Sequence, residues 1–310
     1  MLKIKPAAAY FELCVKSLKG DENNRLMGLL VIPTPNRDKS KRKRINDIDI
    51  SNWKREIKEK EIIVDSLWIF PNREKSGGHT NEYWGNFIPQ IVYQALMRYT
   101  CKGDWVLDLF AGEGTSLIEC KRCGRNGVGV ELIPQVAAKA NQLIKAQENP
   151  KVFAEVIAGD STSVKTRRRV KGILTAHNVS QVQLIILHPP YHNIIRFSDD
   201  PRDLSNAPSI PIFLKKLKRV VKNFADLLEE GRYMILVMGD LYLKGEYIPL
   251  GFRCMDIVLA TGLFKLKATN VKNISGNRGK IGQENLWQYR SLKIGLYLFK
   301  HEYIYVFQKI

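Results

Sequence analysis

Short apolar runs alternate with segments of helical periodicity along most of the chain. The apolar runs are too short for buried helices and are typical of strands in the interior of a sheet. Strands that alternate with helices predict an α/β fold with a largely parallel sheet. The predicted strands cover residues 106–110, 127–132, 155–160, 182–187, 231–240, 265–271 and 301–307, and the predicted helices cover residues 89–101, 116–121, 134–147, 212–230 and 253–261.

The first of these strands opens into a glycine turn. Residues 106–110 are followed by Gly112 and Gly114, and helical periodicity begins directly afterwards. Glycine is required where the backbone takes a positive φ or comes into contact distance of a ligand. A strand, a tight turn and a helix in this order can bind a nucleotide-like cofactor, although one such turn is not specific by itself.

Three of the predicted strands carry an acid at or near the carboxyl end, namely Asp108, Glu131 and Asp160. The carboxyl ends of parallel strands line one edge of the sheet, where ligands bind. Glu131 is placed to accept hydrogen bonds from ribose hydroxyls and Asp160 from an adenine amino group, while Asp108 orders the glycine loop. The three acids therefore predict a nucleoside-shaped ligand.

The fourth strand ends in the tetrapeptide His188-Pro189-Pro190-Tyr191. Two consecutive prolines fix the backbone and remove two N–H donors, so the neighbouring carbonyls are held in place as acceptors. An aromatic ring beside fixed acceptors suits a planar ligand that bears an amino group. The structural alternative is a strand-terminating turn with a packed tyrosine.

Composition and charge favour one large domain with a polyanionic partner. The chain has 310 residues, 45% of them hydrophobic, and its 49 basic and 31 acidic side chains give a net charge of +18. Residues 1–60 hold 15 basic and 8 acidic side chains, and residues 261–310 hold 9 and 2. Charge concentrated at both ends is expected if flanking segments contact a phosphate backbone and the middle performs the chemistry.

Two polar segments are candidates for those contacts. Residues 37–44 form a dense basic run, which is either a solvated loop or an arm that grips a nucleic-acid strand. Residues 272–300, predicted as a loop, mix basic, amide and aromatic side chains, which suits base and phosphate contacts but also a solvated polar loop. The nucleic-acid-binding candidates are Arg42, Arg44, Lys272, Asn277, Arg278, Lys280 and Arg290.

Several other classes of protein are disfavoured. Five cysteines without the spacing of a secreted scaffold favour a reducing cytoplasm. Cys120 and Cys123 form a C-x-x-C motif, but without a second pair or a nearby histidine we predict no metal site. No apolar run approaches the length of a membrane span, and the first residues lack the layout of a signal peptide.

Several of these segments resemble the S-adenosylmethionine-dependent amino-methyltransferases that act on DNA. Residues 108–115 resemble the family's cofactor loop, and residues 188–191 resemble its catalytic tetrapeptide, usually Asp, Asn or Ser followed by Pro-Pro and an aromatic residue. Residues 83–90, in a loop region rich in glycine and aromatic side chains, resemble the segment that contacts the methionine end of the cofactor. Residues 301–307 are similar to the family's last strand, and the resemblance covers residues 65–310.

This resemblance implies a Rossmann-like fold: a seven-stranded, mostly parallel sheet with an antiparallel last strand and helices on both faces. It implies methyl transfer from S-adenosylmethionine to the exocyclic amino group of a base flipped out of double-stranded DNA, in restriction-modification with a cognate restriction endonuclease. Residues 1–60 are then a basic N-terminal extension, and residues 61–310 a catalytic domain with a DNA-recognition insertion at about 272–300. The implied catalytic residues are His188, Pro189, Pro190 and Tyr191, and the implied cofactor-binding residues are Tyr83, Asn86, Phe87, Pro89, Asp108, Phe110, Gly112, Gly114, Thr115, Glu131, Asp160 and Ser161.

His188 departs from the family pattern, in which Asp or Asn tends to accompany adenine N6 methylation and Ser cytosine N4 methylation. The target base therefore stays open. A neutral imidazole can accept one hydrogen bond and can take the proton released after transfer. Two other functions stay open as well: an RNA amino-methyltransferase, although residues 1–60 show no RNA-binding module, and a non-catalytic DNA-binding protein with a methyltransferase fold.

Overall fold

The computed structural model describes residues 44–79, 85–274 and 282–310. The chain divides into two units, Met1–Lys43 and Arg44–Ile310, and all described elements belong to the second. The first residues of the second unit are hydrogen-bonded to later parts of the same unit. Asn46 Nδ2 donates to the carbonyl of Arg98 at 2.9 Å, and Asp47 accepts from the Lys102 amide at 2.6 Å. Residues 44–60, predicted as part of the N-terminal extension, thus contact the domain that carries the predicted catalytic residues.

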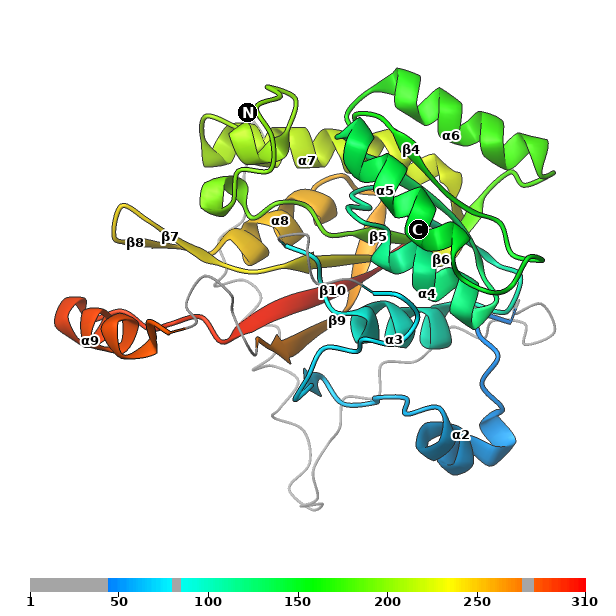
Figure 1. The fold of residues 1–310 in the computed structure, drawn as a ribbon, viewed down its shortest axis with the longest axis horizontal. Helices are drawn as coiled ribbons and strands as arrows, with labels where there is room; N and C mark the ends of the chain where they lie inside the picture. The colour runs from blue at the N-terminus through cyan, green and yellow to red at the C-terminus, as the bar shows by residue number, and fades with distance from the viewer. Residues whose placement is uncertain (1–43, 80–84, 275–281) are drawn as a thin grey trace, which may run out of the picture. The chain divides into compact units, whose positions relative to one another are not determined.

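An eight-stranded mixed sheet forms the centre of the second unit (Figure 1). Its order is β1-β9-β10-β6-β5-β2-β3-β4, and every pairing is parallel except the two made by β10, which runs antiparallel to β6 and β9. A separate hairpin pairs β7 with β8. The strands are β1 (Leu67–Trp68), β2 (Trp105–Asp108), β3 (Asn126–Glu131), β4 (Ala154–Ala158), β5 (Val182–Leu187), β6 (Leu228–Met238), β7 (Leu241–Leu243), β8 (Glu246–Ile248), β9 (Phe264–Asn273) and β10 (His301–Lys309).

The predicted mostly parallel sheet with an antiparallel last strand is confirmed, with one strand more than predicted. The additional strand, β1, has two residues and pairs with the end of β9, where the amide of Val271 donates to the carbonyl of Ser66 at 2.8 Å. Two residues are too few to show a period in the sequence. β1 therefore could be found only through its partner strand.

Helices cover both faces of the sheet. Apolar side chains of α6, α7 and α8 pack on one face, and those of α3, α4 and α5 pack on the other. Besides 3₁₀ turns, the described helices are α2 (Trp53–Glu59), α3 (Pro89–Tyr99), α4 (Thr115–Cys123), α5 (Pro134–Lys145), α6 (Val164–Ala176), α7 (Ile210–Phe224), α8 (Leu250–Leu259) and α9 (Glu284–Ile294).

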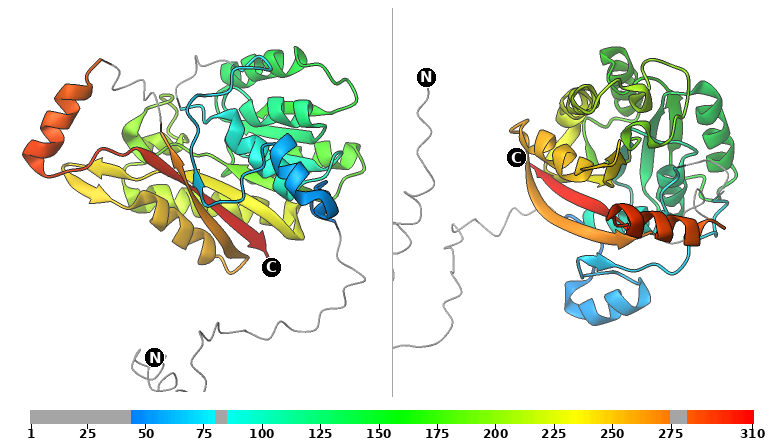
Figure 2. Two further views of the ribbon diagram at one scale, coloured as in Figure 1. Left: turned by 90° about the horizontal axis from the view of Figure 1, so that it is seen from below. Right: turned by 90° about the vertical axis from the view of Figure 1, so that its left-hand side faces the viewer.

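Three of these helices, α2, α6 and α9, were not predicted from the sequence, and α2 buries none of its residues. α6 buries only Thr166, Val170 and Leu174, so a single narrow stripe marks it in an otherwise basic segment. α9 lies in the segment predicted as a loop and buries none of its residues, so no apolar period reveals it. Figures 1 and 2 show α9 projecting beyond the sheet beside the β7–β8 hairpin.

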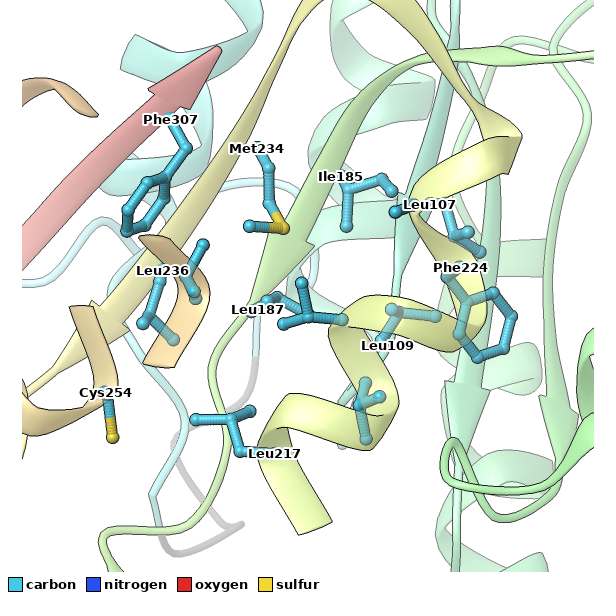
Figure 3. Close-up of a cluster of buried hydrophobic side chains, with 14 of the residues drawn as sticks. Leu107, Leu109, Ile185, Leu187, Leu217, Phe224, Met234, Leu236, Cys254 and Phe307 are labelled. Atoms are coloured by element: carbon cyan, nitrogen blue, oxygen red, sulfur yellow. The ribbon is translucent and has the colours of Figure 1, made fainter. Parts of the chain in front are cut away.

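The larger part of the core lies between the sheet and helices α7 and α8 (Figure 3). Neighbouring strand residues alternate between the two layers, so that Leu107 faces this cluster and Val106 faces the cluster under α3. Because both faces of the sheet are covered, the central strands are largely apolar, as in Leu184–Leu187 of β5 and Met234–Met238 of β6.

Candidate active site

A cleft of about 930 Å³ lies where the central parallel strands end. Residues that follow β2, β3, β4, β5 and β6 line it, as expected for the ligand-binding edge of an α/β sheet. The glycine loop and the His188–Tyr191 tetrapeptide therefore share one cleft. The predicted site residues in its lining are Asn86, Phe87, Phe110, Gly112, Glu131, Asp160, Ser161, His188, Pro189, Pro190, Tyr191 and Lys272.

Asp108 stabilises the glycine loop through hydrogen bonds to residues on either side of it. Its side chain is fully buried and accepts hydrogen bonds from the Phe110 amide, at 2.9 Å, and from the Ser116 hydroxyl. Burial raises the pKa of Asp108 to about 6, although both hydrogen bonds oppose that shift. Gly112 and Gly114 take φ values of 52° and 82°, so the turn uses the backbone freedom that the sequence indicates.

Glu131 braces the same loop from the next strand. Its Oε2 accepts a hydrogen bond from the Gly112 amide at 3.0 Å, and its Oε1 accepts one from the Ile133 amide at 2.9 Å. Burial raises the pKa of Glu131 above its usual range, although these bonds favour the carboxylate. Each carboxylate oxygen can accept a second hydrogen bond, so Glu131 can bind a hydroxyl in the cleft without releasing the loop.

Asp160 and Ser161 form the third wall, after β4. Asp160 accepts from the Thr162 amide and the Thr162 hydroxyl, both at 2.8 Å. Ser161 donates its hydroxyl to the Leu109 carbonyl at 2.7 Å, which ties this loop to the end of β2. The Ser161 proton is thus used inside the protein, while the lone pairs of both side chains remain available to a ligand.

Several predicted cofactor residues do not line the cleft. Pro89 is the buried first residue of α3, and Asp108, Gly114 and Thr115 lie behind the loop that they shape. Tyr83 lies outside the described residues. Contact of these residues with a cofactor stays a prediction.

The structure describes three of the seven predicted nucleic-acid-binding residues, namely Arg44, Lys272 and Arg290. Arg42, Asn277, Arg278 and Lys280 lie outside the described residues. Arg44 is exposed and donates to the Asn46 carbonyl at 2.7 Å, and the Arg290 guanidinium lies 5.4 Å from the centre of the Trp287 ring. Lys272 is buried and paired with Glu302 at 2.7 Å, so it faces the cleft instead of solvent.

The tetrapeptide places two rings beside each other. The centre of the His188 ring lies 4.8 Å from the centre of the Phe87 ring and 5.7 Å from the centre of the Tyr191 ring. The planes of the His188 and Tyr191 rings meet at 88°. Burial lowers the pKa of His188 to about 4, an effect that Glu302 opposes and Lys272 supports. The imidazole is therefore neutral at physiological pH and can accept a hydrogen bond.

Glu302 is the cleft residue that the sequence analysis missed. It accepts a hydrogen bond of 2.9 Å from the Tyr191 hydroxyl and another of 2.7 Å from Lys272. An acid inside the otherwise apolar run of residues 301–307 was the available signal. Other lining residues, including Ile194, Phe197 and Arg202, lie in a segment whose composition indicates only a loop.

The cysteine pair of the C-x-x-C motif lies on α4. Burial raises the pKa of the Cys123 thiol to about 12 and that of Cys120 well above its ordinary value, so neither offers a thiolate near neutral pH. Within residues 44–79, 85–274 and 282–310, no group of three or more His, Cys, Asp or Glu side chains could hold a metal ion. Among the helices that the structure describes, none is long and apolar enough to cross a membrane.

Comparison with known proteins agrees with this geometry. Residues 10–142, which include the glycine loop and Glu131, match the family model described as DNA methylase, of the N6/N4 amino-methyltransferase type. This stretch, which is less than half of the chain, is similar to that DNA methylase family. The family implies S-adenosylmethionine as methyl donor, and the braced glycine loop with Glu131 and Asp160 beside it suits the donor's nucleoside.

Individual DNA methylases match shorter stretches. The type II methyltransferase M.MjaII of Methanocaldococcus jannaschii is 42% identical over 17% of this chain and 10% of its own length. M.XycI of Xanthomonas campestris pv. cyanopsidis is 30% identical over 27% of each chain. The matches thus span about a quarter or less of these relatives. Among solved structures, TrmN from Thermus thermophilus is 15% identical, with 73% of this chain and 50% of that chain covered and a TM-score of 0.44.

Proposed function

We propose that this protein transfers a methyl group from S-adenosylmethionine to the exocyclic amino group of a base flipped out of double-stranded DNA, either adenine N6 or cytosine N4. The observation that carries the proposal is the position of His188–Tyr191 in the same cleft as the glycine loop and Glu131. Methyl donor and acceptor would thereby meet inside one cleft. A role in restriction-modification, with a cognate endonuclease and in the cytoplasm, belongs to the same proposal.

The residues around the glycine loop would hold the donor. S-adenosylmethionine supplies a methyl group on a positively charged sulfonium. Glu131 would accept hydrogen bonds from the ribose hydroxyls, and Asp160 would accept one from the adenine amino group. Asn86 and Phe87 line the cleft near the tetrapeptide, where the methionine end would lie; Phe87 contacts the His188 ring.

The tetrapeptide would hold the target base. The amino group of a base is out of reach inside a duplex, so the base must be flipped, which costs a few kcal/mol of unstacking. Stacking on Tyr191 would recover part of that cost. A base stacked on Tyr191 lies perpendicular to the His188 plane, because the two rings meet at 88°. The imidazole therefore cannot also stack and would act through its ring nitrogen.

Together, His188 and the Pro189 carbonyl would accept hydrogen bonds from the amino group and direct the nitrogen lone pair at the methyl carbon. This is catalysis mainly by positioning. After transfer, the new amine carries a surplus proton, which the neutral His188 could accept.

DNA contacts would come from the basic parts of the chain. The net charge of +18 favours a polyanion, and Arg44 and Arg290 are exposed on the described part of the molecule. We assign residues 1–60 to a basic extension and residues 272–300 to a recognition insertion that includes α9. Arg42, Asn277, Arg278 and Lys280 complete the proposed contacts.

Methyl transfer from labelled S-adenosylmethionine tests the proposal. Purified protein is incubated with duplex DNA of mixed sequence and, separately, with total tRNA, and a Tyr191→Ala variant serves as control. Labelled DNA that the variant fails to produce would support the proposal. Label in tRNA alone would indicate an RNA amino-methyltransferase. No transfer to either, with cofactor binding intact, would indicate a non-catalytic DNA-binding protein.

A further inference from the structure

Tyr191, Glu302 and Lys272 form a chain of polar contacts beside His188, in which Tyr191 is half-buried and the other two side chains are buried. The Tyr191 hydroxyl donates to Glu302 Oε2 at 2.9 Å, and Lys272 Nζ donates to Glu302 Oε1 at 2.7 Å. Glu302 and Lys272 are 7% and 5% exposed. All three residues line the cleft, although they come from the loop after β5, from β9 and from β10.

The register of the sheet makes this contact possible. Glu302 and Lys272 are directly opposite each other on the antiparallel strands β10 and β9, so their side chains share one face. Burying an unpaired carboxylate would be costly, and the facing ammonium offsets that cost. The pair therefore keeps a charged acceptor inside the cleft.

Glu302 is ionised at neutral pH. Burial alone would raise its pKa, but the facing Lys272 ammonium and the two hydrogen bonds outweigh burial and hold the pKa of Glu302 below its usual range. An ionised carboxylate only accepts hydrogen bonds, so Tyr191 must be the donor. The direction of the contact is thereby fixed, and hydrogen bonds to a charged acceptor are among the stronger ones.

The ring of Tyr191 is held from a second side. A β-carbon at Gly239, the residue after β6, would lie 2.8 Å from Cε2 of Tyr191. The absence of that carbon lets the ring pack against the backbone, while Glu302 fixes the phenolic end. A ring with one edge packed and its hydroxyl bound has little freedom to turn.

We propose that Glu302 is a positioning residue for Tyr191, kept charged by Lys272, and that it fixes the ring on which the target base stacks. The inference rests on the proposed methyl transfer and deepens it. It also gives Lys272 a role inside the cleft, in place of the nucleic-acid contact predicted from the sequence.

A double-mutant cycle tests this proposal. Tyr191→Phe keeps the ring and loses the hydroxyl, and Glu302→Gln keeps the shape and loses the charge. Each variant should lower the single-turnover methylation rate about 10-fold to 100-fold, the value of one hydrogen bond to a charged group, with cofactor affinity unchanged within about twofold. The double variant should be no slower than the slower single variant, because one contact is lost in all three. The exposed Glu155→Gln on β4 is the matched control and should behave as wild type.

Lys272→Met distinguishes the two roles of the lysine. If Lys272 acts through Glu302, Lys272→Met should lower the methylation rate about as much as Glu302→Gln does. Its DNA affinity should then keep the wild-type salt dependence. If Lys272 contacts phosphate, the slope of log affinity against log salt falls by about one. The second result would overturn the proposed role of Lys272.

A readout without substrate separates this inference from the proposed function. In the NMR spectrum of protein labelled with ¹³Cζ-tyrosine, the resonance of Tyr191 is assigned by its absence in Tyr191→Phe. Its chemical shift should change in Glu302→Gln but not in Glu155→Gln. Wild-type protein that binds cofactor but methylates no DNA would overturn the proposed function, and the Tyr191 signal then decides the positioning claim. An unchanged signal, or full methylation by Glu302→Gln, would overturn that claim.

Discussion

Gly239 lies so close to Tyr191 that a single added carbon would collide with the ring. The ideal β-carbon position at Gly239 is 2.8 Å from Tyr191 Cε2 and 3.3 Å from Cδ2. Both residues line the cleft, and Gly239 follows directly on the central strand β6. The backbone after β6 therefore determines where the Tyr191 ring, in the loop after the neighbouring strand β5, can lie.

Gly239→Ala should therefore slow methylation about 10-fold or more, because the ring must turn away from its stacking position; such overpacking typically costs about 1–3 kcal/mol. Cofactor affinity should stay near the wild-type value, since Glu131 and the glycine loop are untouched. Single-turnover rates and equilibrium cofactor binding give the two quantities. Gly172→Ala on α6, where a β-carbon meets nothing within 4 Å, is the control and should methylate normally.

His188 should act as a neutral hydrogen-bond acceptor. His188→Ala is expected to lose methylation about 100-fold, within the usual range for a group that handles a proton, and His188→Asn should recover part of that loss. Near-full activity in His188→Ala would remove the imidazole from the mechanism and leave a histidine that is merely tolerated at the strand end.

The pH dependence provides a second measure of the same residue. Its pKa is about 4, so protonation should remove the acceptor only near that pH. The ratio of wild-type to His188→Asn rates should stay constant from pH 8 to pH 5, because any other titrating group affects both proteins. A ratio that falls with a midpoint near 6.5 would contradict the buried, neutral imidazole.

Asp108 should make the fold less stable as pH rises. Its pKa is about 6 in the folded protein against an ordinary value of 3.8, so the folded state holds the proton more tightly. The associated stability is present below pH 4 and lost as pH rises through about 6, a difference of roughly 3 kcal/mol. Urea unfolding of wild type and Asp108→Asn measures it. The free energy of unfolding of wild type relative to the variant should fall by about that amount between pH 4 and pH 8, and no change would contradict the burial of this carboxylate.

Glu131→Gln should weaken cofactor binding. Both carboxylate oxygens accept hydrogen bonds from backbone amides, those of Gly112 and Ile133. Glutamine replaces one of these oxygens with an amide nitrogen, which cannot accept, so one of the two bonds is lost. We expect a loss of about 10-fold or more in S-adenosylmethionine affinity, measured by calorimetry, with DNA affinity unchanged. Equal loss in Glu155→Gln would show that the effect is not specific to the loop.

Local patterns were sufficient for most of the fold and for both motifs of the cleft. The seven main strands are apolar runs bounded by polar residues, and Gly112 and the His188–Tyr191 tetrapeptide are recognisable within a few residues. Such features depend on neighbours in the sequence, so the sequence displays them.

The remaining features depend on contacts between distant segments. Lys272 was predicted to bind nucleic acid because its surroundings are polar, and only the register of β9 and β10 reveals Glu302 opposite it. α2, α6 and α9 were not predicted because none of them carries a broad apolar stripe. Tyr191 and Glu302 are 111 residues apart, and no spacing rule connects them.

Expression of the full chain in cells that lack DNA methylation, followed by sequencing that detects modified bases, tests the central claim most directly. The account predicts N6-methyladenine or N4-methylcytosine at one recurring sequence motif, absent from cells that express Tyr191→Ala. A genome without either modified base, from cells in which the protein is folded and binds S-adenosylmethionine, would contradict it.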